Sequence, residues 1–365
     1  MQRVLFSESS RHVGGQELQL LAQAVGLQAR GIESRILCRA DCQLTERATE
    51  KGIRVLNIPF RNSFHLPSIA AVHRELRSFR PDALLCHSGH DANTGALAAR
   101  LMTRRPVLLR ARTYQHGVPR AFSYNTLFDR TLLPSEALRS QLLLNSGIDP
   151  TRLHVLHPGI DFDGIVAAAR LPLTKEVAES IGELPQRRIV HAAMLRPEKG
   201  HLLMLDVIAA LQGKYPDIAY VIAGEGEMRE PILNRAKSLG ISHRVALLGL
   251  VTPIPALLQH ATLVVMPSSY EPLGMSQIEA LALGIPVVAS RVGGIPETIS
   301  DGTTGLLAAP DDSGAWVDAI DRALATPEQM QAMAKRGSTD VRRRFSMSSN
   351  LDGLLEHITA GRLPQ

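Results

Sequence analysis

Short apolar runs alternate with longer amphipathic segments along the whole chain. The runs include RVLF, SRILC, DALLCH and PVLLRA in the first half, and RRIVHAAM, AYVIAG, TLVVMPS and IPVVAS in the second. Between them lie segments with helical periodicity, such as GQELQLLAQAVGLQA and SIAAVHRELRSF. Consecutive apolar residues indicate strands that are covered on both faces, as in a parallel sheet flanked by helices. The alternation therefore predicts doubly wound α/β units.

The two halves of the chain begin alike. RVLFSESSRHVGGQELQLLAQAV and RRIVHAAMLRPEKGHLLMLDVIAAL both indicate a strand, a glycine-containing loop and a helix. We predict two Rossmann-like domains, 1–168 and 186–345, with a linker at 169–185 and a last helix at about 346–360 that packs back on the first domain. Ligands of such sheets bind beyond the carboxyl ends of the strands. Two such edges that face each other are expected to form a cleft for a small molecule.

Length and composition restrict the class of protein. A chain of 365 residues is too long for one ordinary core and favours two domains. Aromatic residues make up only 4% of the chain, which does not favour base stacking along single-stranded nucleic acid. No apolar run reaches the roughly 20 residues of a membrane span, and the N-terminus lacks the pattern of a signal peptide. The three cysteines do not indicate a disulfide framework. From these features together we expect a soluble, cytoplasmic protein.

The charge is unevenly distributed. Residues 1–168 hold 21 Lys and Arg against 14 Asp and Glu, a net charge of +7, whereas the remaining residues hold 19 against 21, a net charge of −2. Almost all of the excess is arginine, and no acid lies between Arg100 and Arg112. Such a half suits an anionic acceptor, a peripheral contact with the inner face of a membrane, or nucleic acid. A solvated basic face explains the pattern equally well.

The stretch SSYEPLGMSQIEALALGIPVVASRVGG, residues 268–294, places polar groups where a strand ends. We predict a buried strand that ends at about Ser268 and a helix from Pro272 to about Leu283. Glu271 then lies directly before the helix. Amides at the start of the helix favour an anion, and Gly274 permits close approach of a ligand. These amides belong to Leu273, Gly274, Met275 and Ser276.

A second carboxylate, Glu279, leans back toward the start of the same helix. Two carboxylates would then flank a group of amides that attract phosphate. This arrangement suits a ligand with hydroxyls at both ends and phosphates between them, and a sugar nucleotide is such a ligand. The alternative is that Glu271 only complements the helix dipole, worth about 0.3–1 kcal/mol, and that Glu279 is a surface charge. Because the apolar run ALALGIPVV follows Glu279, we do not expect this acid to be fully solvated.

EPLGMSQIEALALGIPVVAS resembles the signature of the retaining GT-B glycosyltransferases of family 4, with two glutamates separated by seven residues. RVGGIPETISDGTTGLLAAPDD is similar to further stretches of that family, as are AMLRPEKG, VIAGEGEM, HPGID and the GG at 14–15. The likeness is strong over 186–345 and weaker over 1–168. It implies a GT-B fold and a retaining, metal-independent hexosyltransferase that takes its sugar from a nucleoside diphosphate, most readily a UDP-sugar, and needs no cofactor.

The resemblance also implies roles for matching residues. Glu279 would bind the ribose hydroxyls of the donor and Glu271 the hexose. Arg196 and Lys199 would bind the diphosphate, on which negative charge grows as the sugar–phosphate bond breaks. The other donor-binding candidates are loop positions that follow strands, namely Gly14, Gly15, Gly224, Gly226, Leu250, Gly274, Met275 and Ser276.

Two of these assignments have simpler alternatives. The family commonly has G-R-L-x-x-x-K-G where this chain has AMLRPEKG, so Met194 occupies the usual arginine position and Arg196 is a displaced substitute. A lone Arg or Lys in a loop is ordinarily a surface residue. Gly14 and Gly15 also fit a flexible turn before a helix.

Candidates in the first half concern the hexose and the acceptor. His116 follows a buried strand, where the family often places a histidine against the hexose, and Arg112 is a similar candidate. In LLCHSGHDA, the loop residues His87 and His90 are expected to touch the acceptor or the hexose. Cys86 lies beside them, but the spacing matches no recognised zinc site, and we predict no metal.

The function expected from these features is hexose transfer from a nucleoside-diphosphate sugar to an acceptor hydroxyl. The acceptor is expected to be a glycan or lipid-linked molecule, such as a lipopolysaccharide precursor or another cell-surface glycan. The main alternative is a sugar-nucleotide epimerase or hydrolase on the same fold. A nicotinamide dehydrogenase would show G-x-G-x-x-G where this chain has SESSRHVGGQ. A nucleic-acid binder is supported by the arginine excess alone, so we expect no nucleic-acid partner.

Overall fold

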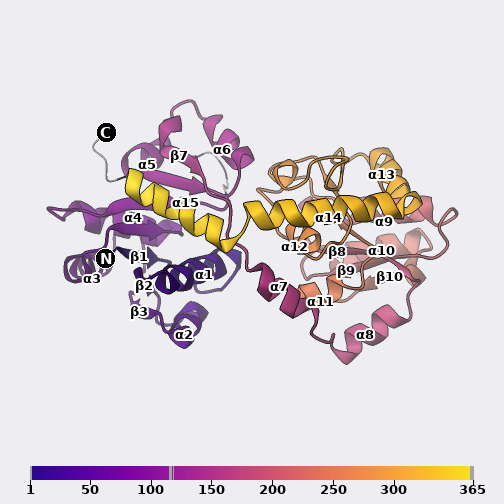
Figure 1. Ribbon diagram of the computed structural model, residues 1–365, viewed down its shortest axis with the longest axis horizontal. Helices are drawn as coiled ribbons and strands as arrows, with labels where there is room; N and C mark the ends of the chain where they lie inside the picture. Colours follow the sequence, from indigo (N-terminus) through magenta and orange to yellow (C-terminus); the bar gives the residue numbers. More distant parts are fainter. Residues whose placement is uncertain (1, 115–116, 118, 362–365) are drawn as a thin grey trace. The chain divides into compact units, whose positions relative to one another are not determined.

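The computed structural model describes residues 2–114, 117 and 119–361, and within them the chain folds into two compact units (Figure 1). Unit 1 comprises residues 1–160 and 345–365, and unit 2 comprises residues 161–344. Each unit contains one sheet in which all neighbouring strands run parallel. The predicted α/β class, with two Rossmann-like domains, is confirmed.

Unit 1 contains a seven-stranded sheet with the order β3-β2-β1-β4-β5-β6-β7. Its strands are β1 Arg3–Ser7, β2 Glu33–Cys38, β3 Arg54–Asn57, β4 Ala83–Cys86, β5 Val107–Ala111, β6 Arg130–Leu133 and β7 Leu153–Val155. Its helices in the described part are α1 Gly15–Ala29, α2 Gln43–Glu50, α3 Leu66–Phe79, α4 Gly89–Arg100, α5 Ala121–Thr126, α6 Glu136–Leu143 and α15 Met347–Ala360, with a 3₁₀ turn η1 at Pro150–Arg152.

Unit 2 contains a six-stranded sheet with the order β10-β9-β8-β11-β12-β13. Its strands are β8 Arg187–Ala192, β9 Ile218–Ala223, β10 Val245–Leu247, β11 Leu263–Met266, β12 Val287–Ser290 and β13 Leu306–Ala308. Its helices are α7 Phe162–Ala169, α8 Lys175–Gly182, α9 His201–Leu211, α10 Arg229–Ser238, α11 Ile254–Leu258, α12 Ser276–Ala282, α13 Ser313–Ala325 and α14 Pro327–Arg344, with 3₁₀ turns η2 Pro197–Lys199, η3 Ser242–Arg244 and η4 Ile295–Glu297.

The strands of unit 1 are apolar at consecutive positions because both faces of the sheet are covered. In β1, Val4 and Phe6 pack into a core with α1, α2 and α15, whereas Leu5 packs into a second core with α3 and α4. Helix α15 lies against α1 (Figure 1), and a Cβ atom at Gly26 of α1 would stand 2.6 Å from a Leu351 methyl. The absence of a side chain at this position allows the two helices to approach closely.

Both sheets reverse their strand order at one point, between β1 and β4 in unit 1 and between β8 and β11 in unit 2. From such a switch point the connections leave to opposite sides, and this opens a crevice at the carboxyl ends of the strands, where ligands of doubly wound folds bind. The sequence places polar loops there, after Ser7 and Cys86 in unit 1 and after Ala192 and Met266 in unit 2.

Two boundaries differ from those predicted. Unit 1 ends at residue 160 rather than 168, and the expected linker at 169–185 contains α8. The reason is packing: α7 belongs to unit 2, where the Arg342 guanidinium lies 5.2 Å from the centre of the buried Phe162 ring. The other difference is α12, which begins at Ser276 rather than at Pro272. Gly274 has φ 85°, a left-handed conformation that a right-handed helix excludes.

Candidate functional site

The loops at the switch point of unit 2 carry an ion pair. Lys199 follows β8 and Glu271 follows β11, and the Lys199 Nζ lies 2.6 Å from Glu271 Oε2. Their side chains are only 18% and 12% exposed, so water screens this pair less than it screens a surface pair. The ammonium carries three donors, of which the pair uses one. A cation and a carboxylate with spare hydrogen-bonding capacity are therefore fixed at the position where the fold binds ligands.

Further contacts hold the same loops together. Ser276 at the start of α12 donates its hydroxyl to the Ala192 carbonyl at the end of β8, at 2.8 Å. The N–H of Ser269 donates to the Glu198 carbonyl, also at 2.8 Å. These bonds join the segment after β8 to the segment after β11. The loops thus form one preorganised unit, as a binding site for a charged ligand requires.

Glycines allow these loops to pack backbone against backbone. A Cβ atom at Gly293, which has φ 53°, would lie 1.9 Å from the Glu271 carbonyl oxygen. At Gly224 and Gly226 a Cβ atom would meet the carbonyls of Ala193 and Leu195 at 1.9 and 2.4 Å. Gly224 and Gly226, both predicted to bind the donor, therefore also have a structural role: the absence of a side chain lets them pack against the backbone of the loop that leads to Lys199.

We expect Gly293→Ala to destabilise unit 2 by about 2 kcal/mol or more, because the methyl group collides with the backbone of Glu271. Gly240→Ala is the matched control: Gly240 has φ 70°, but a Cβ atom there would meet no atom within 4 Å. The chain has one tryptophan, Trp316, in the core of unit 2, so its fluorescence follows the unfolding of that unit. Equal unfolding midpoints for the two variants would contradict the packing argument.

Glu279 lies in α12, half-buried and without a hydrogen-bond partner for its side chain among the described residues. Burial raises the pKa of its carboxyl to about 7. An ionised carboxylate in this position lacks the donors that would stabilise it. The prediction that Glu279 is not a solvated surface charge agrees with this burial, and a ligand that supplies hydroxyl donors would remove the penalty.

Without any ligand, we expect Glu279→Gln to stabilise unit 2 at pH 8 by about 1–3 kcal/mol and to have little effect at pH 4, below the ordinary pKa of the carboxyl. The sign follows from the raised pKa. The folded state holds the Glu279 proton more tightly than the unfolded chain does. The free energy of unfolding therefore decreases as the pH rises from about 4.5, the ordinary pKa, to about 7, the pKa in the folded protein. The measurement is the urea midpoint by Trp316 fluorescence at both pH values. A destabilised variant at pH 8 would show that the carboxylate has partners in the folded protein.

Other residues predicted for the site in unit 2 are more exposed to solvent than Lys199 and Glu271. Arg196 is 52% exposed, and its nearest acid, Glu198, is 4.0 Å away. Met194 is 53% exposed and Leu250 is 81% exposed. Arg196 is thus an exposed cation with one long ion pair, whereas Lys199 is largely buried and held by Glu271. Because α12 begins at Ser276, the amides of Gly274 and Met275 belong to the loop before the helix, and Ser276 provides the first helical N–H.

The switch point of unit 1 carries an acid that the sequence reasoning missed. Glu8, which follows β1, is fully buried and accepts hydrogen bonds from the Ser88 hydroxyl after β4 and the Gln16 amide of α1. It also accepts the N–H of Ser10. Glu8 lies at the switch point of its sheet, as Glu271 does in unit 2, but it follows β1, the counterpart of β8, whereas Glu271 follows β11. The available signal was an acid two residues after the apolar run RVLF and before the first helix.

The histidines of the neighbouring loop are not equivalent. His87 is buried, with its ring nitrogen Nδ1 3.2 Å from the Ser7 carbonyl oxygen, and burial lowers its pKa. His90 is exposed, with its Nδ1 3.2 Å from the Ser63 hydroxyl. Burial, reinforced by the charge of Glu8, raises the pKa of Asp91 well above its ordinary value. Of the two histidines, His90 is the accessible one.

The remaining candidates of unit 1 are the glycines and Arg112. The N–H of Gly14 donates to the Glu17 carboxylate at 2.8 Å, whereas Gly15 begins α1 with open space beside it. Arg112 directly follows β5 and is half-buried. His116 lies outside the described residues. Between residues 2 and 361, leaving out 115, 116 and 118, there is no cluster of three or more metal-ligating side chains. No helix in the described part has the length and hydrophobicity needed to cross a membrane.

Comparison with known families covers most of the chain. The sequence model described as Glycosyltransferase Family 4 matches residues 13–163, and the one described as Glycosyl transferases group 1 matches residues 175–340. The chain belongs to the family 4 glycosyltransferases. The family expected from the two glutamates and the glycine-rich loops is confirmed.

Relatives of this family 4 glycosyltransferase include the D-inositol 3-phosphate glycosyltransferase of Mycolicibacterium smegmatis, 32% identical over 232 residues. The match covers 62% of this chain and 52% of the relative, so the chain spans about half the length of the curated relatives it matches.

Several solved structures share the fold over nearly the whole chain. A glycosyltransferase from Rickettsia africae has a TM-score of 0.85 at 18% identity and covers 100% of this chain and 99% of its own. HepE from Anabaena, in complex with UDP-glucose, has a TM-score of 0.80 at 21% identity and covers 99% of this chain and 100% of its own. These likenesses establish the GT-B fold of this family 4 glycosyltransferase.

Proposed function

We propose that this family 4 member transfers a hexose from a nucleoside-diphosphate sugar, most readily a UDP-sugar, to the hydroxyl of an acceptor, with retention of configuration. The observation that carries the proposal is the Lys199–Glu271 pair, 2.6 Å apart at the switch point of unit 2. It offers a cation for a diphosphate and a carboxylate for sugar hydroxyls within the reach of one ligand. The relative in complex with UDP-glucose supports this donor class.

In the proposed reaction, the bond between the anomeric carbon and the phosphate oxygen breaks, and its electron pair stays on the diphosphate. The acceptor oxygen forms the new bond on the same face of the sugar and passes its proton to the departing phosphate. Lys199 stabilises the negative charge that grows on the diphosphate. Because the Glu271 carboxylate is already held by Lys199, it suits a hydrogen bond to the hexose better than nucleophilic attack.

Glu279 completes the donor site in this proposal. Its carboxylate has no partner among the described residues, and adjacent ribose hydroxyls supply two donors. Binding of the ribose would lower the raised pKa by hydrogen bonds to the charged form. The amides of Gly274, Met275 and Ser276 would then bind oxygens of the hexose and phosphate.

The acceptor is proposed to bind at the carboxyl edge of the unit 1 sheet, near Glu8, His90 and Arg112. The net charge of +7 over residues 1–168 favours an acceptor that carries phosphate. The relative named for D-inositol 3-phosphate is consistent with a phosphorylated acceptor. A structural neighbour named as a lipopolysaccharide outer core galactosyltransferase is consistent with a precursor of a cell-surface glycan.

The test is a donor and acceptor screen of the purified protein. UDP-, GDP- and ADP-sugars are first ranked by thermal shift, and the best donor is then incubated with phosphorylated sugars, inositol phosphates and lipid-linked saccharides. Formation of a glycoside with the anomeric configuration of the donor supports the proposal. Release of the nucleotide without any glycoside from the whole acceptor panel would favour an epimerase or hydrolase. A glycoside of opposite configuration would refute retention.

A further inference from the structure

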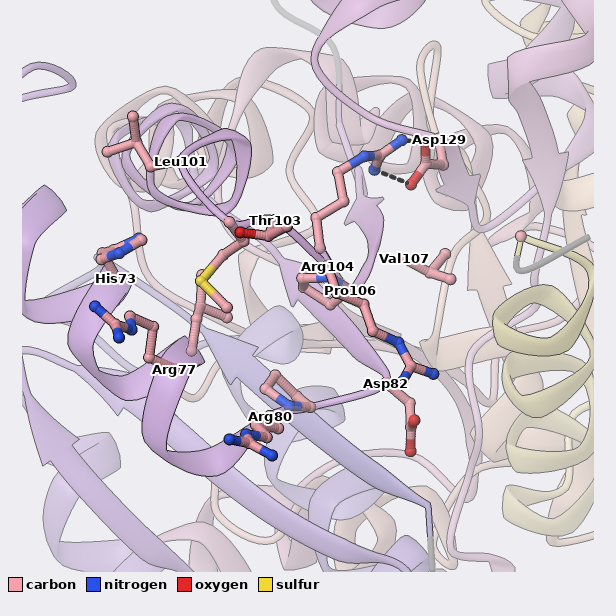
Figure 2. Close-up of a pocket in the computed structure, with 15 residues that line it drawn as sticks. His73, Arg77, Arg80, Asp82, Leu101, Thr103, Arg104, Pro106, Val107 and Asp129 are labelled. Atoms are coloured by element: carbon pink, nitrogen blue, oxygen red, sulfur yellow. Dashed lines mark hydrogen bonds and ion pairs between the residues drawn. The ribbon is translucent and has the colours of Figure 1, made fainter. Parts of the chain in front are cut away.

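A basic cavity of about 940 Å³ lies in unit 1 (Figure 2). Its walls come from the end of α3 and the loops that lead into β4, β5 and β6, where Asp82, Pro106 and Asp129 directly precede the three strands. Figure 2 shows His73 and Arg77 of α3 on one side of the cavity and Val107 and Asp129 on the other. All these parts belong to one unit.

The cavity is at the amino edge of the sheet. Because β4, β5 and β6 are parallel, their carboxyl ends, with His87 and Arg112, lie at the opposite edge. β5 has five residues, so the two edges are separated by about 16 Å at roughly 3.3 Å per residue. The cavity is therefore distinct from the proposed acceptor region.

The charges of the cavity are unbalanced. Four arginines and two aspartates line it, and Arg105 already forms two hydrogen bonds with Asp129, at 2.7 and 2.8 Å. Asp82 accepts the backbone N–H of Arg3 at 2.7 Å. Arg77, Arg80 and Arg104 are exposed and form no ion pair with any residue that the structure describes. With Asp129 paired to Arg105, three guanidinium groups and one carboxylate, that of Asp82, remain at this concavity, so its lining carries a net charge of +2.

The walls of the cavity suit a ligand with an anionic group. An arginine guanidinium can donate two parallel hydrogen bonds to two oxygens of one phosphate, a geometry that a lysine ammonium does not offer. Arg80 ends α3 with φ 51°, a left-handed conformation in which glycine or asparagine is usual. Leu101, 67% exposed, adds an apolar surface at the rim. The volume falls in the range of about 300–1,000 Å³ that is typical of small-molecule sites.

We propose that this cavity, lined by Arg77, Arg80 and Arg104, is a second binding site, for a phosphomonoester or phosphodiester group. The group belongs either to a small phosphorylated solute or to the headgroup of an anionic lipid. The site also gives a specific role to part of the arginine-rich segment 100–112. In that segment Arg110 is buried against the Tyr124 ring, and Arg112 lies at the other edge of the sheet.

The experiment compares two double variants that remove the same charge. Arg77→Gln/Arg104→Gln alters the cavity, and Arg47→Gln/Arg54→Gln alters exposed arginines of α2 and β3 outside it. Fructose 1,6-bisphosphate and inorganic phosphate are titrated by calorimetry at constant ionic strength. Binding to phosphatidylcholine vesicles, with and without phosphatidylglycerol, is measured by co-sedimentation. We expect the cavity variant to lose at least about tenfold in affinity for one of these probes, and the control variant less than about twofold.

The two sources of phosphate give different results. Selective loss of binding to the soluble phosphates identifies a solute site, and selective loss of binding to phosphatidylglycerol vesicles identifies a headgroup site. The proposal is overturned if wild-type protein binds none of the probes, if the cavity variant keeps its affinity, or if both double variants weaken binding equally. Release of UDP from UDP-sugars should be the same in all three proteins, so failure here is separate from failure of the proposed transferase activity.

Discussion

Lys199→Ala is expected to lower the turnover number of sugar transfer by about 100- to 1,000-fold, the range seen when one preorganised donor to a developing negative charge is removed. The ammonium is fixed by Glu271 at 2.6 Å and is only 18% exposed, so water replaces it poorly. Steady-state kinetics with saturating donor measure the effect. Because the charge on the diphosphate grows during bond breaking, the turnover number is expected to fall more than the donor affinity.

Two companion variants make this result interpretable. Lys199→Arg keeps a cation and is expected to retain part of the activity. Arg196→Gln removes a cation that is 52% exposed and is expected to lower turnover by less than about tenfold. If Lys199→Ala keeps near-normal turnover while Arg196→Gln loses it, the displaced arginine of AMLRPEKG binds the diphosphate instead.

Glu279→Ala is expected to weaken donor binding by about 10- to 100-fold, because two hydrogen bonds to a charged group are lost. Isothermal titration with the nucleotide that gives the largest thermal shift measures the dissociation constant. The exposed Glu328 of α14 provides the control, and Glu328→Ala is expected to bind like wild type. Unchanged donor affinity in Glu279→Ala would contradict the proposal that Glu279 binds the ribose of the donor.

The pH dependence of donor binding gives a second signature of Glu279. The carboxyl of the free protein has a pKa of about 7, and acceptance of two ribose hydroxyls requires the ionised form. Donor affinity is therefore expected to be constant above pH 8 and to fall by up to about tenfold per pH unit below 7. Glu279→Gln should remove this dependence over pH 6–8. A wild-type profile that is flat over this range would contradict the assignment.

The fold was predictable because its signals are local. Runs such as RVLF and TLVVMPS are apolar at every position, and such strands must be covered on both faces. The last helical pattern, SMSSNLDGLLEHI, forms α15, whose Leu351, Leu354 and Ile358 pack into the core of unit 1. The family was recognised by resemblance, since the two glutamates and the adjacent glycines of its signature occur within one continuous stretch.

Contacts between distant segments were not predictable in the same way. Nothing in the sequence pairs Lys199 with Glu271, which are 72 residues apart, and the pairing arises because β8 and β11 are neighbours in the sheet. Glu8 meets Ser88 for the same reason, through β1 and β4. The start of α12 was predicted too early because Pro272 suits a first helical turn, whereas the left-handed φ of Gly274 delays the helix until Ser276.

The most direct test of the central claim, that a nucleoside-diphosphate sugar binds at the carboxyl edge of the unit 2 sheet, is amide hydrogen exchange with and without UDP-glucose at saturating concentration. We predict slower exchange in residues 193–200, 224–228 and 269–280, which contain the loops after β8, β9 and β11. The same segments in Glu279→Ala should need a higher ligand concentration for equal protection. Protection that appears only outside these three segments, with saturation demonstrated by calorimetry, would contradict the account.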